Sequence, residues 1–177
     1  MDPIIIRPAK IEDSPGIARV RIDTWRSAYK GIVPQKHLDE LSLPAITVQF
    51  QDLFQQDSLC LWVGEEKDEI IGFAYAGEYR GDDPAAGEVY AIYILDNYQG
   101  QGIGHQLMAA VCQQLRQSGK TSLYLDALEA NPYRRFYERL GGTIVRKETF
   151  VIEDEALPLV YYWWPDINQL CQDSQPS

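Results

Sequence analysis

Three glycines at alternate positions, Gly100, Gly102 and Gly104, separate a strand-like segment from a helix-like one. Residues 88–95 (EVYAIYIL) are typical of a buried strand, and residues 102–118 carry apolar side chains at helical spacing. The start of a helix presents backbone N–H groups without intrahelical partners and the positive end of the helix dipole. Glycines also let the backbone adopt positive φ and approach a phosphate closely. The stretch therefore predicts an anion-binding loop.

Two well-known phosphate-binding loops do not match this stretch. A dinucleotide motif anchored at Gly100 and Gly102 needs glycine or alanine at position 105, where the chain has His105. A P-loop needs Gly-Lys followed by Ser or Thr, and this is missing. Taken alone, the stretch also allows a glycine-rich turn that binds nothing.

The order of the predicted elements indicates a single-domain α/β fold with a mixed sheet and helices on both faces. The expected strands cover residues 3–8, 59–64, 70–77, 88–95, 122–128, 143–152 and 157–164. The first expected helix begins at Asp13 or Ser14 and ends at Gly31. A second helical stretch covers residues 34–56 and is divided at Pro44. Two further helices are expected at 102–118 and 131–140. We expect the domain to span residues 1–166 and residues 167–177 to form a polar tail.

Composition limits the classes of partner. A chain of 177 residues with 45% hydrophobic residues can bury one core, and the apolar run in its opening MDPIIIRPAK lacks the flanks of a signal peptide. We therefore expect a soluble, cytoplasmic protein. Its net charge of −10 disfavours nucleic acid and anionic membranes as partners and mildly favours a cationic one.

Cysteines and histidines are too few for metal chemistry. The three cysteines, Cys60, Cys112 and Cys171, are far apart, and we expect buried free thiols. With only His37 and His105, a histidine-rich metal site is nearly excluded, and no metal is expected.

Two motifs carry a family resemblance. The spacing Gln99-x-x-Gly102-x-Gly104 resembles the pyrophosphate loop of the GNAT superfamily of acetyl-CoA-dependent N-acetyltransferases. Residues 131–142 (NPYRRFYERLGG) are similar to the family's N-x-x-[AR]-x-x-F-Y-E-x-x-G-F segment, and depart from it at Gly142, where an aromatic residue is usual. Both motifs together indicate the family more strongly than either alone.

The resemblance extends from Ile4 to about Trp164 in element order, and residues 24–34 (TWRSAYKGIVP) are common in one branch. It implies a mostly antiparallel sheet of about seven strands. The fourth and fifth strands, 88–95 and 122–128, would run parallel and splay apart, with the coenzyme in the cleft between them.

The resemblance also implies which residues bind acetyl-CoA. The pantetheine arm would pair with the backbone of the fourth strand, and the pyrophosphate would lie on N–H groups of the glycine loop. The side chain of His105 would either reach the phosphates or, as we favour, face solvent. The expected set is Ile92, Tyr93, Ile94, Gln99, Gly100, Gln101, Gly102, Ile103, Gly104, His105, Asn131 and Tyr137.

Tyr137 matches the family's general acid, which protonates the departing thiolate, although its helical spacing fits core packing as well. Glu88 matches a position that often serves as general base, and an exposed carboxylate at a strand end is the alternative. Asp126 and Glu129 are weaker candidates. A backbone N–H near Tyr93 would stabilise the oxyanion. A covalent route through Cys112 is disfavoured because the cysteine lies inside a predicted helix.

Trp25, Arg26 and Tyr29 lie about one helical turn apart and are expected to contact the acceptor, or equally to pack in the core. The negative charge favours cationic amines, with polyamines and peptide or protein amino groups ahead of antibiotic amines. An acidic acceptor would instead point to Arg26 or Arg80 as its partner. Neither longer acyl donors nor a homodimer is excluded.

These residues predict an enzyme that transfers acetyl from acetyl-CoA to a primary amine by direct attack in a ternary complex. One alternative is a catalytically silent coenzyme A-binding sensor or interaction protein of the same fold. A second is an unrelated nucleotide-binding regulator, which explains the glycines but not residues 131–142.

Overall fold

The computed structural model describes residues 3–172. They form a seven-stranded sheet in the order β1-β2-β3-β4-β5-β7-β6. β4 and β5 run parallel, and the other neighbouring strands are antiparallel, which confirms the predicted mixed sheet. The strands are β1 (Ile5–Pro8), β2 (Cys60–Glu66), β3 (Glu69–Glu78), β4 (Ala86–Ile94), β5 (Ser122–Leu128), β6 (Thr143–Ile152) and β7 (Glu155–Trp164).

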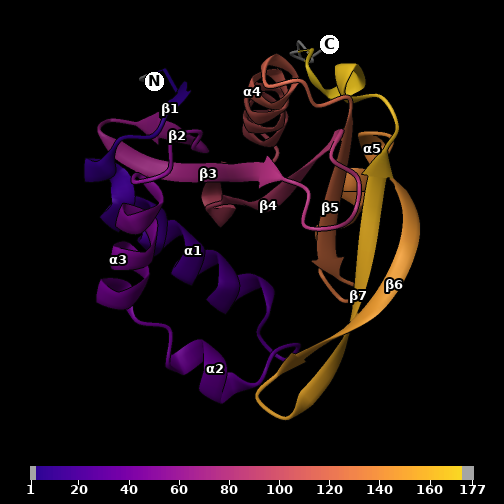
Figure 1. Ribbon diagram of the computed structural model, residues 1–177. Helices are drawn as coiled ribbons and strands as arrows, with labels where there is room; N and C mark the ends of the chain where they lie inside the picture. Colours follow the sequence, from indigo (N-terminus) through magenta and orange to yellow (C-terminus); the bar gives the residue numbers. More distant parts are fainter. Residues whose placement is uncertain (1–2, 173–177) are drawn as a thin grey trace.

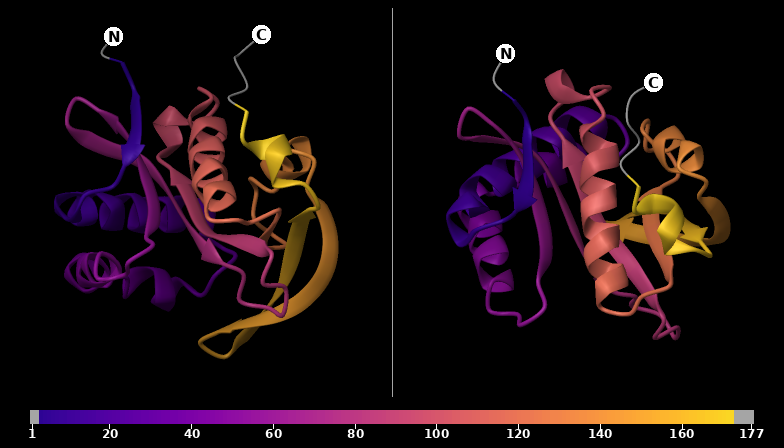
Figure 2. Two further views of the ribbon diagram at one scale, coloured as in Figure 1. Left: turned by 45° about the horizontal axis from the view of Figure 1, so that its top comes forward. Right: turned by 90° about the horizontal axis from the view of Figure 1, so that it is seen from above.

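Helices cover both faces of the sheet, as predicted. α1 (Ser14–Ala28) and α3 (Leu43–Leu53) lie on one side of β3, and α4 (Ile103–Gln117) lies on the other (Figure 1). Each amphipathic helix turns its apolar side chains to the sheet, Ile17 and Val20 from α1 and Leu107 and Val111 from α4, and all four are fully buried. The views in Figure 2 show the same two layers around the sheet.

The splay between β4 and β5 is also confirmed. The two strands pair only from Ala86–Ser122 to Val89–Leu125, after which β4 continues to Ile94 without β5 as a neighbour. β5 continues beside β7 instead, and a register shift in the β3–β4 pairing opposite Tyr90 bends β4 at the point of separation. The divergence of β4 and β5 is visible in Figure 1.

Two predicted helices differ from the structure. The stretch from residue 34 breaks before Pro44, because α2 (Gln35–Asp39) ends early and α3 begins with Ser42 as its cap. The Ser42 side chain accepts a hydrogen bond from the Ala45 N–H, and proline in the first helical turn sacrifices no hydrogen bond. The helix expected over 131–140 is only α5 (Arg135–Arg139), preceded by a turn.

The predicted polar tail is corrected for the residues that the structure describes. Residues 167–170 form a 3₁₀ helix, and Ile167, Leu170 and Cys171 are buried in the core that contains α4. Their spacing of three and four residues places the three apolar side chains on one face. Residues 173–177 of the expected tail lie outside the described residues.

Among residues 3–172, no helix combines the length and the apolar character needed to cross a membrane.

Candidate active site

The glycine loop has the backbone conformation that its sequence predicts. Gly100 has φ of +73° and Gly102 has φ of +80°, and Gly102 is the N-cap of α4. A Cβ built on either glycine would meet no atom within 4 Å, so the left-handed backbone rather than crowding explains the two residues. Gly104 differs, because its Cβ would come within 3.1 Å of the Phe136 ring. The third glycine therefore allows close packing between α4 and α5.

The loop presents a row of unpaired amide donors. The N–H groups of residues 100–105 donate no hydrogen bond within residues 3–172, and the first bond into α4 runs from Gln106 N–H to the Gly102 carbonyl at 3.2 Å. We call these N–H groups the amide cradle. Successive free amides at the positive end of a 15-residue helix present the donors that an anion such as a phosphate requires.

Side chains around the cradle are mostly occupied elsewhere. Ile103 is buried in the core and offers only its amide. Gln99 Nε2 donates to the Ile94 carbonyl at 3.1 Å, and Gln101 Nε2 donates to the Asn97 carbonyl at 3.1 Å. The His105 ring is half-buried edge-on against Phe136, with centroids 5.2 Å apart. The free donors of this loop are therefore backbone amides.

The free edge of β4 adds peptide groups to the site. Leu95 N–H donates to the Ile71 carbonyl in β3, and peptide groups alternate in direction along a strand. Tyr93 therefore also turns its peptide groups toward β3, whereas those of Ile92 and Ile94 point to the open side. The Gln99 contact with the Ile94 carbonyl agrees with this direction. An extended ligand can pair with this edge as an added strand.

Tyr137 is buried in an aromatic cluster and still has an unbonded hydroxyl. Its ring is buried between Phe136 and Tyr162, each with its centroid 5.5 Å away. Its hydroxyl makes no hydrogen bond to any residue between 3 and 172. Burial raises the pKa of this phenol, and the neighbouring Tyr93 and Tyr162 raise it further. The group is therefore protonated at neutral pH and free to donate.

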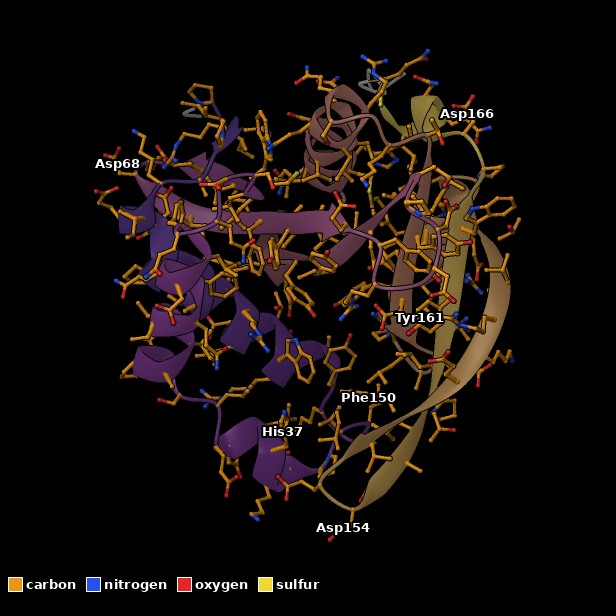
Figure 3. The ribbon with its side chains drawn as sticks, viewed as in Figure 1. His37, Asp68, Phe150, Asp154, Tyr161 and Asp166 are labelled. Carbon is orange, nitrogen blue, oxygen red and sulfur yellow. The ribbon has the colours of Figure 1, made fainter. Side chains whose placement is uncertain are left out.

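A cavity of about 690 Å³ lies on the α1 side of the splay. It is enclosed by α1, α2, α3, the splayed strands and the β6–β7 hairpin; His37 on α2 and Phe150 on β6 are labelled in Figure 3. We call it the main cavity. Its lining includes Arg21, Trp25, Tyr29, His37, Phe50, Tyr75, Arg80, Tyr90, Tyr93, Asp126, Phe150 and Glu153.

Asp126 is the carboxylate of β5 that lines the main cavity. Burial raises its pKa above the ordinary value; Arg80, 3.6 Å away, opposes this, and Glu88 adds to it. Glu129, three residues after Asp126 and just beyond the end of β5, does not line the cavity. Its carboxylate pairs with Lys147 at 2.6 Å, and that hydrogen bond lowers its pKa.

Glu88 is not the exposed strand-end carboxylate that the sequence also allowed. Its side chain is 1% exposed, and it is not part of the cavity lining. Arg80 holds it, with the Arg80 N–H 3.0 Å from Oε2 and the Arg80 Nε 3.1 Å from Oε1. The charge of Glu88 is therefore compensated by Arg80, which lies between Glu88 and the main cavity that it lines.

Trp25 and Tyr29 line the main cavity and are tied to the predicted coenzyme site. Trp25 Nε1 donates to the Tyr93 hydroxyl at 3.0 Å, and Asn131 Nδ2 donates to the Tyr29 hydroxyl at 3.1 Å. Asn131 Oδ1 accepts a hydrogen bond from the Tyr133 N–H at 2.8 Å, and this bond stabilises the turn before α5. These bonds join α1 to β4 and to the α5 segment across the splay.

Arg26 does not contact the cavity. Its Nε donates to the Leu38 carbonyl at 3.1 Å and so holds the end of α2. Two other arginines line the cavity, Arg80 and Arg21, and the sequence analysis missed Arg21. Helical spacing of four residues, from Arg21 through Trp25 to Tyr29, was the signal that could have found it.

The cysteines lie in the core. Cys112 is fully buried inside α4, and burial raises its pKa well above the ordinary value. We expect Cys112→Ala to keep turnover within about twofold and to lower stability by roughly 1 kcal/mol, as for a small core truncation. Thiol release from acetyl-CoA and thermal melting measure the two effects. Loss of turnover in a folded variant would instead support a covalent route.

Within residues 3–172, no group of three or more His, Cys, Asp or Glu side chains is arranged to hold a metal ion.

Known proteins share this fold and sequence pattern. The model of the Acetyltransferase (GNAT) family matches residues 21–142. The uncharacterized N-acetyltransferase YuaI of Bacillus subtilis is 34% identical over 170 residues, which cover 94% of this chain and 96% of YuaI. An N-acetyltransferase structure from Staphylococcus aureus Mu50 covers 93% of this chain and 99% of its own, with a TM-score of 0.72 and 22% identity. The PaiA N-acetyltransferase of Thermoplasma acidophilum, solved with coenzyme A, covers 89% and 98%, with a TM-score of 0.68 and 16% identity.

Proposed function

Since the chain belongs to the GNAT family of acetyltransferases, we propose that it transfers an acetyl group from acetyl-CoA to a primary amine by direct attack while both are bound. The observation that carries this proposal is the splay between β4 and β5. It separates two sites, the amide cradle on one side and the main cavity on the other. Asp126 lines the main cavity, and its charge contributes to the raised pKa of Tyr137.

The residues of this chain fit coenzyme A. The amide cradle offers donors for the pyrophosphate, and the free peptide groups of Ile92 and Ile94 offer an edge for the amide-containing arm. Acetyl-CoA supplies the acetyl group as an activated thioester. Asn131, which is bonded to Tyr29, helps to fix the α5 segment beside this arm.

Asp126 is the better candidate for the general base. An ammonium group has no lone pair, so its proton must leave before attack, and a carboxylate in the acceptor cavity can accept it. Asp126 lines that cavity and has a raised pKa, whereas Glu88 is held by Arg80 outside it. We therefore assign the base to Asp126, and Glu88 becomes a positioning residue that holds Arg80 beside Asp126.

Tyr137 is assigned as the general acid, because its hydroxyl proton has no acceptor among residues 3–172. It would donate to the sulfur as the thioester bond breaks. The N–H of Ile92 or Ile94, rather than that of Tyr93, would stabilise the negative charge that develops on the carbonyl oxygen. This refines the expected oxyanion donor by one residue, since the Tyr93 peptide groups point toward β3.

The coenzyme assignment is tested first by binding. At a hundredfold excess over its Kd, acetyl-CoA should stabilise the fold by about 2.7 kcal/mol and raise the melting temperature by roughly 5–10 °C. Gly102→Val should raise the Kd about tenfold or more, because a β-branched residue is strained at positive φ and the loop must rearrange. Isothermal titration and thermal shift measure the change.

Gly119→Val is the matched control. Gly119 follows the other end of α4, has φ of +92° and also has no atom within 4 Å of a built Cβ. It therefore creates similar backbone strain without touching the amide cradle, and its acetyl-CoA affinity should match that of the parent. Equal affinity of all three proteins would exclude the amide cradle as the pyrophosphate site.

Thiol release with a panel of amines separates an enzyme from a silent binder. An enzyme releases thiol at a rate that depends on the amine, whereas a sensor of the same fold shows the thermal shift alone.

A further inference from the structure

We propose that the acceptor is an amino carboxylate, whose carboxylate binds Arg21 and whose amine faces Asp126. This inference rests on the proposed function and names its substrate class. It starts from the charges in the main cavity, whose lining contains both cationic and anionic side chains.

Arg21 is the cation of the cavity that has no partner. Its guanidinium makes no hydrogen bond or ion pair within residues 3–172, although it lines a cavity with aromatic walls. Arg80, in contrast, is bound to Glu88, and Glu153 is paired with Lys36 at 3.4 Å. A guanidinium beside apolar walls loses hydration, and a carboxylate can replace it with two parallel hydrogen bonds.

Tyr93 supplies a second donor in the cavity that Arg21 and Asp126 line. Its hydroxyl oxygen accepts from Trp25, and its proton has no acceptor within residues 3–172. Burial raises the pKa of this phenol, the charge of Arg21 lowers it, and the charge of Asp126 raises it. The hydroxyl therefore lies within electrostatic reach of both charged residues. A ligand carboxylate at Arg21 can accept this proton while its amine extends to Asp126.

The remaining walls indicate the body of the acceptor. Phe50, Tyr75 and Tyr90 line the cavity together with Trp25 and Tyr29. Such walls favour an apolar or aromatic group between or beside the two charges. A zwitterion carries no net charge, so the overall charge of −10 does not repel it as it would repel a simple anion.

The experiment compares amines that differ only in the carboxylate. Phenylalanine is paired with phenethylamine and tyrosine with tyramine, and a phosphate-bearing amine, phosphoethanolamine, is added. In the parent, thiol release should show a lower KM for the carboxylate member of each pair. Arg21→Gln should raise that KM about 10- to 30-fold, as expected for the loss of a charge-assisted hydrogen bond, with kcat changed less. The amines without a carboxylate should be unaffected.

Arg21→Lys and Lys30→Gln are the controls. Arg21→Lys keeps the charge without the planar fork and should retain part of the preference. Lys30→Gln removes an exposed charge just after α1, so it changes the net charge equally without touching the cavity. Melting temperatures of all variants should match the parent, because the Arg21 side chain bonds to no described residue.

Equal KM values within the pairs, or an equal effect of Arg21→Gln on both members, would overturn the inference. If the parent prefers the phosphate-bearing amine and Arg21→Gln removes that preference, the claim that the acceptor carries a carboxylate is overturned. If no amine releases thiol, the proposed function fails, and the inference is then decided by binding. Saturation-transfer NMR with phenylalanine should show binding to the parent that Arg21→Gln weakens, and absence of that binding would overturn it.

Discussion

Asp126→Asn should lower kcat/KM for acetyl transfer by about 10³-fold at neutral pH, within the usual range for loss of a general base. The asparagine keeps the size of the side chain and its place in the cavity lining, but it cannot accept a proton. Affinity for acetyl-CoA should stay near that of the parent, because the amide cradle lies on the other side of the splay. Steady-state thiol release and isothermal titration measure the two quantities.

Glu88→Gln and Glu129→Gln are the matched controls, since they remove the other two carboxylates considered for the base. Glu129→Gln should leave turnover near that of the parent, because its carboxylate pairs with Lys147 outside the main cavity. Glu88→Gln should act mainly on pH dependence. If Glu88→Gln lowers kcat/KM by about 10³-fold while Asp126→Asn lowers it little, the base is Glu88.

The pH profile gives an independent reading of the base. Burial raises the Asp126 pKa, so activity should fall as the pH decreases through a midpoint above the ordinary carboxyl value. Glu88→Gln removes a negative charge that raises this pKa and releases Arg80, whose charge lowers it. The acid limb should therefore move to lower pH in Glu88→Gln. An unchanged acid limb would contradict electrostatic coupling between the two residues.

Tyr137→Phe should lower kcat by about 10²-fold with folding unchanged. The hydroxyl bonds to no residue among 3–172, so its removal breaks no internal hydrogen bond, and the phenylalanine ring keeps the contacts with Phe136 and Tyr162. Coenzyme affinity should change little. Thiol release with a good acceptor, a melting curve and isothermal titration distinguish the roles of acid and core residue.

Tyr162→Phe is the control from the same aromatic cluster. Its hydroxyl donates to Glu138 Oε1 at 3.0 Å and accepts from Arg134 at 3.2 Å, away from the splay. Loss of these bonds should cost about 1 kcal/mol of stability and leave turnover near that of the parent. Equal turnover in Tyr137→Phe and the parent would assign Tyr137 to packing alone, or show that thiolate departure does not limit the rate.

Local patterns explain why so much of this fold could be predicted. The apolar runs of β4 and β5, the helical spacing of α4 and the glycines with positive φ are each fixed by short-range chemistry. The two motifs also placed the amide cradle and Tyr137 on the correct elements. The prediction failed in two places. Capping by Ser42 starts α3 before Pro44, and apolar contacts bury residues 167, 170 and 171 of the expected polar tail.

The arrangement of charged side chains was beyond the sequence. From the sequence, Glu88, Asp126 and Glu129 were all candidates for the general base. The structure separates them, because Glu88 pairs with Arg80 and Glu129 pairs with Lys147, and only the folded sheet brings these partners together. The sequence likewise did not show which arginine of α1 reaches the cavity. Arg21 lies on the side of α1 that faces the cavity, and Arg26 lies on another side.

The sequence by itself thus determined the elements, the backbone conformation of the glycine loop and the family, because these depend on spacing along the chain. Only the tertiary structure decided that Asp126 and Arg21 line the main cavity while Glu88, Glu129 and Arg26 do not, because burial and pairing depend on neighbours distant in the chain.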